Sequence, residues 1–219
     1  MNTPWPEVPL LLFPALGETL TMVGIVMLLV VLLGTPIGIL LHNTSPLGLF
    51  PRARMHAIIS AAANTGRSLP FLVLMAAVIP FTRLLVGTNI GIGAAVVPMT
   101  LAGIPFFARL VQGAIREVPR ETMAVGIVSG GHPLQIIQGV QLKEALPGLV
   151  AGFVINLIAM IEYSAIAGAI GAGGLGYLAI NYGYQRFDAN IMLACVITLI
   201  ALTQLIQFIG DRAVVRLSH

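Results

Sequence analysis

Long uncharged stretches constrain this chain more than any other feature of its sequence. Asp, Glu, Lys and Arg are absent from residues 19–51, 84–108, 145–161 and 189–210. A helix that rises about 1.5 Å per residue crosses about 30 Å of hydrocarbon in roughly 20 residues, so each stretch can hold most or all of a membrane span. Charged residues make up only 9% of the chain, against roughly 25% in soluble domains. A soluble enzyme, a disordered chain and a nucleic-acid-binding protein are therefore excluded as first interpretations.

These stretches predict an all-α, polytopic membrane protein with five transmembrane helices. The predicted spans lie within a single transmembrane domain at 19–211, at about residues 20–41, 61–81, 84–105, 148–169 and 189–210. Residues 1–18 are too short to cross the bilayer, and we expect them at the outer face. Residues 212–219 form a short cytoplasmic tail in this prediction.

The uncharged segment 122–142 is a poor candidate for a membrane span. Only 10 of its 21 residues are apolar, and Gly130, Gly131, His132 and Pro133 interrupt it. Proline is well accepted in the first turn of a helix, so two short amphipathic helices joined by a tight turn fit the pattern better. We expect a helical hairpin at about 117–142, whose apolar stripe needs a partner to cover it.

The basic residues predict how the spans are oriented, because cytoplasmic loops are enriched in Lys and Arg. Only Arg83 and Arg186 fall on one side of the predicted spans. The other side holds Arg52, Arg54, Arg109, Arg116, Arg120, Lys143, Arg212 and Arg216. The hairpin is then cytoplasmic, the N-terminus lies outside and the C-terminus lies inside.

A glycine-rich segment follows the fourth predicted span. Residues 171–176 match the pattern GxGxxG through Gly171, Gly173 and Gly176, with Gly174 between them. A dinucleotide site needs such a turn between a strand and a helix, whereas this one follows a membrane helix. We expect a flexible or closely packed loop at the outer mouth, which serves either packing or contact with an external partner.

The sequence supports neither catalysis nor metal binding. Its four histidines lack metal-ligand spacing, and Ser164, within the fourth span, has no predicted histidine to activate it. Glu162 is the one acidic residue predicted well inside a span, where an ionised carboxylate costs roughly 2.5–3.5 kcal/mol. Glu162 either lines a translocation path, with Ser164 nearby, or is a water-exposed or interface residue without a substrate role.

Five segments taken together resemble the five-span permease of bacterial methionine ABC importers, which has the type I importer permease fold. The segments are RSLPF at 67–71, IPFTRLLVGTNIG at 79–91, EALPGLV at 144–150, GAGGLG at 171–176 and QFIGDR at 207–212. The resemblance runs over nearly the whole chain, from about residue 16 onward.

The hairpin departs from the pattern of such permeases, which resembles EAAxxxG, nine further residues and IxLP. Gly130 and Leu142 match this pattern, whereas Ala124 stands for the glutamate and Lys143 for the final proline. Glu121 lies three residues before Ala124 on the same helical face, and we hypothesise that it replaces the missing carboxylate. The expected ATPase-coupling residues are Glu121, Ala124, Gly130, His132, Pro133 and Leu142.

The resemblance implies a homodimer in the bacterial inner (cytoplasmic) membrane, surrounded by lipid, with the path between its two copies. Each hairpin would dock on one of two ABC ATPase subunits, which use ATP and Mg²⁺. An external methionine-binding lipoprotein would deliver the substrate. The chain itself would carry no cofactor and no enzymatic activity. Two alternatives stay open: a secondary transporter or channel for a small solute, and a membrane scaffold or assembly protein.

Overall fold

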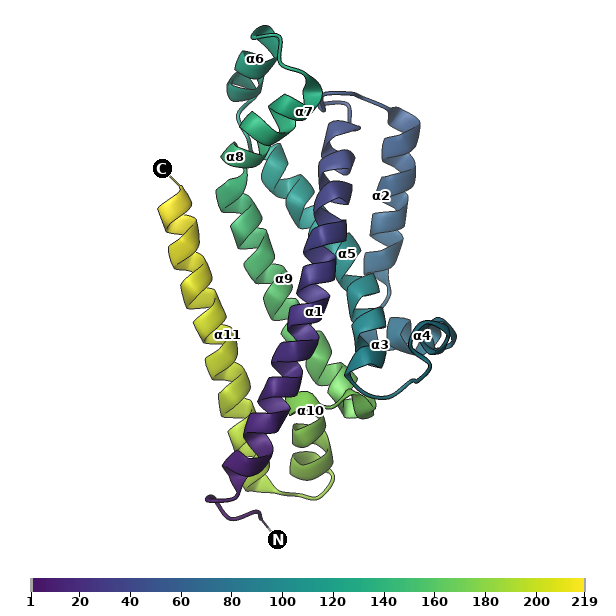
Figure 1. The fold of residues 1–219 in the computed structure, drawn as a ribbon, viewed down its shortest axis with the longest axis vertical. Helices are drawn as coiled ribbons and strands as arrows, with labels where there is room; N and C mark the ends of the chain where they lie inside the picture. The colour runs from purple at the N-terminus through teal and green to yellow at the C-terminus, as the bar shows by residue number, and fades with distance from the viewer. Residues whose placement is uncertain (1, 219) are drawn as a thin grey trace.

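The computed structural model describes residues 2–218, which form helices and connecting loops with no strand among them. Figure 1 shows long helices side by side, with a group of short helices at each end of the molecule. The chain begins at one end and finishes toward the opposite end.

Within residues 2–218, four helices are long and apolar enough to cross a membrane. They are α1 (Val8–Asn43), α5 (Ile92–Arg116), α9 (Leu146–Ala167), which continues as the π-helical turn η2 (Gly168–Ala172), and α11 (Ala189–Leu217). A fifth crossing is formed only if α2 (Ala53–Ser68) and α3 (Phe71–Ala77), which bend by 102° relative to each other, count as one broken span.

The short elements gather at the two ends of the long helices (Figure 1). One end holds the hairpin, which consists of α6 (Arg120–Val128), α7 (Pro133–Ile136), the π-helical turn η1 (Ile137–Gln141) and α8 (Leu142–Glu144). The other end holds α4 (Ile79–Val86), α10 (Gly174–Leu178) and the π-helical turn η3 (Ala179–Tyr184). The expected helical hairpin is therefore present, at the end of the molecule where α1 finishes.

The structure corrects the second and third predicted spans. The predicted helix 61–81 is broken at Pro70, whose backbone is extended (φ −56°, ψ 135°) and lies between α2 and α3. The predicted span 84–105 is displaced along the chain. Helix α4 ends at Val86 because the next residue, Gly87, has a left-handed backbone (φ 79°), and α5 then runs from Ile92 to Arg116.

Arg109 explains why the third span was misplaced. Its guanidinium donates hydrogen bonds to the carbonyl and hydroxyl oxygens of Ser60 (3.0 and 2.6 Å), to Asn64 Oδ1 (2.8 Å) and to Gln112 Oε1 (2.8 Å). Because α2 supplies three of these four acceptors and α5 itself supplies the fourth, Gln112, a charged residue is accommodated inside α5. A prediction that ends spans at charged residues cannot anticipate this.

The first long helix begins earlier than the predicted span at about 20–41, because α1 already begins at Val8. Pro9 stands in the first turn, where its missing N–H is not needed, and the helix continues past Glu18 without a break. The Glu18 carboxylate accepts a hydrogen bond from the backbone N–H of Gly174 (2.6 Å). This bond gives the charged group a partner at the end of the span.

Small residues let α1, α5 and α9 approach closely. A Cβ atom at Gly38 of α1 would lie 2.6 Å from the carbonyl oxygen of Ala108 in α5. A Cβ atom at Gly103 of α5 would lie 2.6 Å from Val30 and 3.2 Å from the sulfur of Met160. Such close backbone packing is typical of helices within membranes, and it places α5 at the centre of the bundle.

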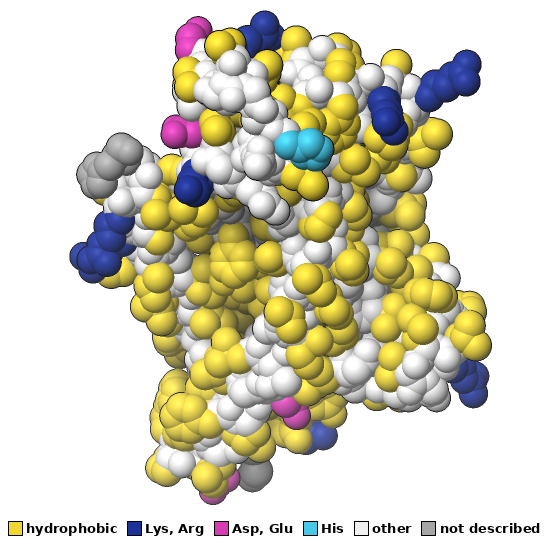
Figure 2. All heavy atoms as spheres, turned by 45° about the horizontal axis from the view of Figure 1, so that its top comes forward, with side chains coloured by type: hydrophobic (Ala, Val, Ile, Leu, Met, Phe, Trp, Pro, Cys, Tyr) yellow, Lys and Arg dark blue, Asp and Glu magenta, His cyan; other side chains and the backbone are white. Residues whose placement is uncertain are grey.

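The surface separates charge from apolar area. Figure 2 shows Lys, Arg, Asp and Glu side chains toward the two ends of the visible face, while hydrophobic side chains cover much of the area between them. Large apolar residues of α11 remain exposed, including Ile197, Ile200, Leu205, Phe208 and Ile209. This distribution fits a molecule whose middle contacts lipid or another apolar surface.

Candidate functional site

Local sequence explains how the hairpin turns. Gly130 adopts a positive φ (73°), which glycine reaches without the cost that a Cβ imposes. His132 then caps α7. Its side-chain Nδ1 accepts a hydrogen bond from the backbone N–H of Leu134 (3.4 Å), and its backbone N–H donates a hydrogen bond to Gln135 Oε1 (2.9 Å). Pro133 occupies the start of α7, where no N–H is needed.

A buried amide pair fastens the hairpin to the end of α1. Asn43 Nδ2 donates to Gln141 Oε1 (2.8 Å), and Gln141 Nε2 donates back to Asn43 Oδ1 (3.2 Å). Asn43 is 0% and Gln141 1% exposed. Since buried polar groups need partners, the pair fixes the position of η1 against α1.

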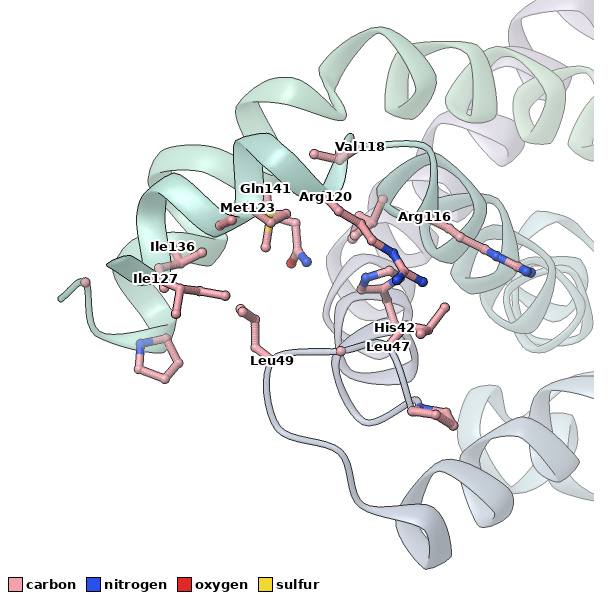
Figure 3. A pocket seen from close by; sticks show the side chains of 16 residues that line it. His42, Leu47, Leu49, Arg116, Val118, Arg120, Met123, Ile127, Ile136 and Gln141 are labelled. Atoms are coloured by element: carbon pink, nitrogen blue, oxygen red, sulfur yellow. The ribbon is translucent and has the colours of Figure 1, made fainter. Parts of the chain in front are cut away.

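A cavity of about 670 Å³ lies between the hairpin and the ends of α1 and α5. Its polar wall includes His42 of α1, Arg116 of α5 and Arg120 of α6, and Ala124 also lines it. Figure 3 shows His42 and Arg120 directed into the same part of the cavity, while Arg116 extends away from them toward the right of the view. Among the described residues, 2–218, none that lines this cavity is acidic.

The structure places Glu121 apart from Ala124. Glu121 lines a separate hollow with Glu144, Thr122, Val125, Gly139 and Val140, whereas Ala124 faces the cavity with the arginines. Leu142 is half-buried and packs against the main apolar core. The residues predicted for coupling therefore lie in one hairpin but on different surfaces of it.

The two residues predicted for the translocation path lie close together on α9 but in different environments. Glu162 is exposed, whereas Ser164 is buried and donates its hydroxyl hydrogen to the carbonyl oxygen of Ile161 (2.7 Å). Between them, Tyr163 stacks on Phe71 of α3, with ring centroids 4.3 Å apart. The Ser164 hydroxyl thus has its hydrogen-bond partner within its own helix. Of these two residues, Glu162 is the one whose polar group is exposed at the surface.

The glycine-rich segment is a packed turn between α9 and α10. Gly171, Gly173 and Gly174 adopt positive φ angles of 104°, 91° and 78°. A Cβ atom at Gly176 would overlap the backbone of Ala165. The turn is tied to neighbouring elements by the bond from Gly174 to Glu18, by one from Leu175 N–H to Thr19 Oγ1 (2.9 Å), and by one from Gly91 N–H to the carbonyl of Gly171 (3.0 Å).

Within residues 2–218, no group of three or more His, Cys, Asp or Glu side chains could hold a metal ion. Sequence reasoning missed the Asn43–Gln141 pair, Glu18 and Arg109 as structural groups, and it missed the cavity. A polar residue directly after a span was the only available signal for Asn43, and nothing in the sequence linked it to Gln141.

Comparisons with known proteins agree with this architecture. Residues 34–219 match the family described as binding-protein-dependent transport system inner membrane component. The chain is 47% identical over 209 residues to the probable D-methionine transport system permease protein MetI of Vibrio cholerae, which covers 95% of this chain and 93% of that protein. The D-methionine transport system permease protein MetI of Escherichia coli K12 is 43% identical over 158 residues, covering 72% of this chain and 73% of the relative.

Solved structures show the same fold. A structure described as inward-facing conformations of the MetNI methionine ABC transporter matches with a TM-score of 0.95 and 40% identity, over 99% of this chain and 100% of the other. An amino acid ABC transporter solved with histidines shares the fold at a TM-score of 0.80 and 18% identity, again over 99% of this chain and 100% of the other. The chain therefore belongs to the family of binding-protein-dependent transport system inner membrane components.

Proposed function

We propose that this chain is the membrane-spanning permease subunit of an ATP-driven methionine importer. The observation that carries the proposal is the agreement of the whole chain, hairpin included, with a structure from the MetNI methionine ABC transporter at 40% identity. Relatives named as D-methionine permeases at 47% and 43% identity support the same substrate class. The proposal covers methionine without choosing between its two stereoisomers.

A second copy of the chain completes the transport path in this proposal. Asn64, Arg67 and Ser68 are exposed near the break between α2 and α3, and polar side chains at membrane depth are costly against lipid. A homodimer with two-fold symmetry would cover this surface with the same surface of its partner. The path would run between the two copies, with Glu162 as its proposed acidic group.

Separate ABC ATPase subunits supply the energy in this proposal, because the sequence contains no GxxxxGK[ST] phosphate-binding loop. These subunits would bind ATP and Mg²⁺ at the cytoplasmic face of the inner membrane and hold the hairpin. When they move, the buried Asn43–Gln141 pair would pass the displacement to α1 as a rigid-body motion. An external binding lipoprotein would deliver methionine at the opposite end, beside the N-terminal end of α1.

Reconstitution tests the transport function directly. The chain is placed in proteoliposomes with its ATPase subunits and binding protein, and uptake of labelled L-methionine, D-methionine and leucine is compared with and without ATP. We expect ATP-dependent accumulation of methionine and no comparable accumulation of leucine. Gradient-driven flux through the chain alone would contradict the proposal and favour a secondary transporter or channel, and assembly without any flux would favour a scaffold.

The role of Glu121 in coupling is tested with a matched control in the same hollow. Glu121 and Ala124 line different hollows of the hairpin, so we propose that Glu121 supplies a docking carboxylate from its own surface, and Glu121→Ala should lower methionine-stimulated ATP hydrolysis in the assembled transporter. Glu144→Ala removes a neighbouring exposed carboxylate and should have a smaller effect. Unchanged stimulation in Glu121→Ala would show that Glu121 does not take over this role.

A further inference from the structure

The cavity beneath the hairpin concentrates positive charge without a carboxylate to balance it. The charge comes from Arg116 of α5 and Arg120 of α6, which line the cavity together with the imidazole of His42 from α1, and no Asp or Glu of residues 2–218 lines it. The neighbouring acids Glu121 and Glu144 face the separate hollow instead. An anion that entered the cavity would therefore meet arginine side chains from α5 and α6 and no carboxylate.

Apart from Gln141, the remaining side chains that line the cavity are apolar, and the ends of two spans define its position. Leu47, Leu49, Met123, Ile127 and Ile136 contribute apolar surface. His42 stands at the end of the span α1, and Arg116 is the last residue of α5, so the basic groups lie where a span leaves the bilayer. A volume of about 670 Å³ falls within the range of small-ligand sites, roughly 300–1,000 Å³.

We propose that this cavity binds a phosphate group. Guanidinium groups match phosphate oxygens with paired, charge-assisted hydrogen bonds, and the cavity offers two of them, Arg116 and Arg120. The phosphate can belong to an anionic lipid headgroup, because basic pockets between spans at the cytoplasmic surface suit such headgroups, or it can be free inorganic phosphate. In either case the bound group joins the hairpin to the ends of α1 and α5.

Ala124 gives the proposal a sharp internal test. Its small side chain lines the cavity beside the arginines, so Ala124→Glu places a carboxylate where the phosphate would bind. Ala124→Gln adds nearly the same volume without the charge. If electrostatic attraction holds the ligand, Ala124→Glu should weaken binding much more than Ala124→Gln does.

The experiment uses the purified full-length chain in detergent and two probes. Native mass spectrometry follows retention of phosphatidylglycerol against phosphatidylcholine, and equilibrium dialysis follows labelled inorganic phosphate. Arg116→Gln combined with Arg120→Gln should lower the affinity for the bound probe roughly 30-fold, the value expected for the loss of two basic groups. Arg212→Gln combined with Arg216→Gln removes the same charge from α11, outside the cavity, and should weaken it far less.

Each outcome decides the proposal. Selective retention of phosphatidylglycerol that depends on Arg116 and Arg120 assigns a lipid headgroup, and phosphate binding alone with the same dependence assigns free phosphate. Binding of neither probe to the wild-type chain overturns the proposal and leaves the cavity to an acidic side chain of a partner protein. Equal loss in the control pair, or equal effects of Ala124→Glu and Ala124→Gln, overturns it as well.

Discussion

Breaking the amide pair between α1 and the hairpin should cost a measurable free energy of unfolding. In Gln141→Leu, Asn43 loses both reciprocal hydrogen bonds, of 2.8 and 3.2 Å. Its Nδ2 keeps the carbonyl of Ile39 at 3.0 Å, but its Oδ1 keeps only the N–H of Leu49 at 3.5 Å. Two neutral hydrogen bonds and one poorly satisfied buried oxygen together amount to about 2–4 kcal/mol.

A double-mutant cycle separates the pair from its surroundings. The free energy of unfolding is measured in mixed detergent micelles for the wild type, Asn43→Leu, Gln141→Leu and the double variant. Replacing both partners leaves no amide of the pair unsatisfied, so the double variant should lose less than the sum of the single losses. Gln138→Leu changes an exposed glutamine in the same π-helical turn and should stay within about 0.5 kcal/mol of wild type.

Two results would show that the Asn43–Gln141 pair does not hold the hairpin to α1. Strictly additive single losses would show that the two amides do not interact in the folded protein. A loss in Gln138→Leu as large as that in Gln141→Leu would show that any change in the turn, rather than the buried pair, weakens the hairpin.

Three further changes test other parts of the structure. Glu162→Gln should impair methionine uptake while assembly with the ATPase subunits stays intact, and normal uptake kinetics would remove Glu162 from the path. Asp188 caps α11; burial alone would raise its pKa, but hydrogen bonds from Thr3 and from the first N–H groups of α11 hold this pKa below the ordinary 3.8. Its stabilising contribution is therefore present above pH 3.8 and is lost as the pH falls through the lowered pKa, so thermal unfolding of Asp188→Asn should lack this acid dependence. Gly176→Ala pushes a Cβ atom into the backbone of α9 and should cost about 1–3 kcal/mol, whereas Gly113→Ala meets open space and should cost nothing.

The helical membrane fold could be predicted from the sequence because uncharged stretches report directly on the bilayer. This signal identified the helices now seen as α1, α9 and α11. It failed at Glu18 and Arg109, where the structure supplies hydrogen-bond partners from elements distant in the sequence. A charge that finds such partners need not end a span, and no periodicity or composition can reveal those partners in advance.

The hairpin was predictable, but its attachment was not. Gly130, His132 and Pro133 act locally, so their sequence order alone indicates a turn followed by a helix start. Asn43 and Gln141 are 98 residues apart, and their pairing depends on how η1 packs against α1. The cavity likewise exists only because three helix ends meet, although Ala124 already marked this position as unusual.

Photo-cross-linking from the hairpin tests most directly whether this end of the chain meets an ATPase. A benzoylphenylalanine residue replaces Val128 of α6, which is 86% exposed, or Leu84 of α4, which is 82% exposed at the opposite end of the molecule. Each variant is co-expressed with the ATPase subunit and irradiated. We expect an adduct of this chain with the ATPase subunit from position 128 and none from position 84. An adduct from position 84, or none from position 128, would contradict it.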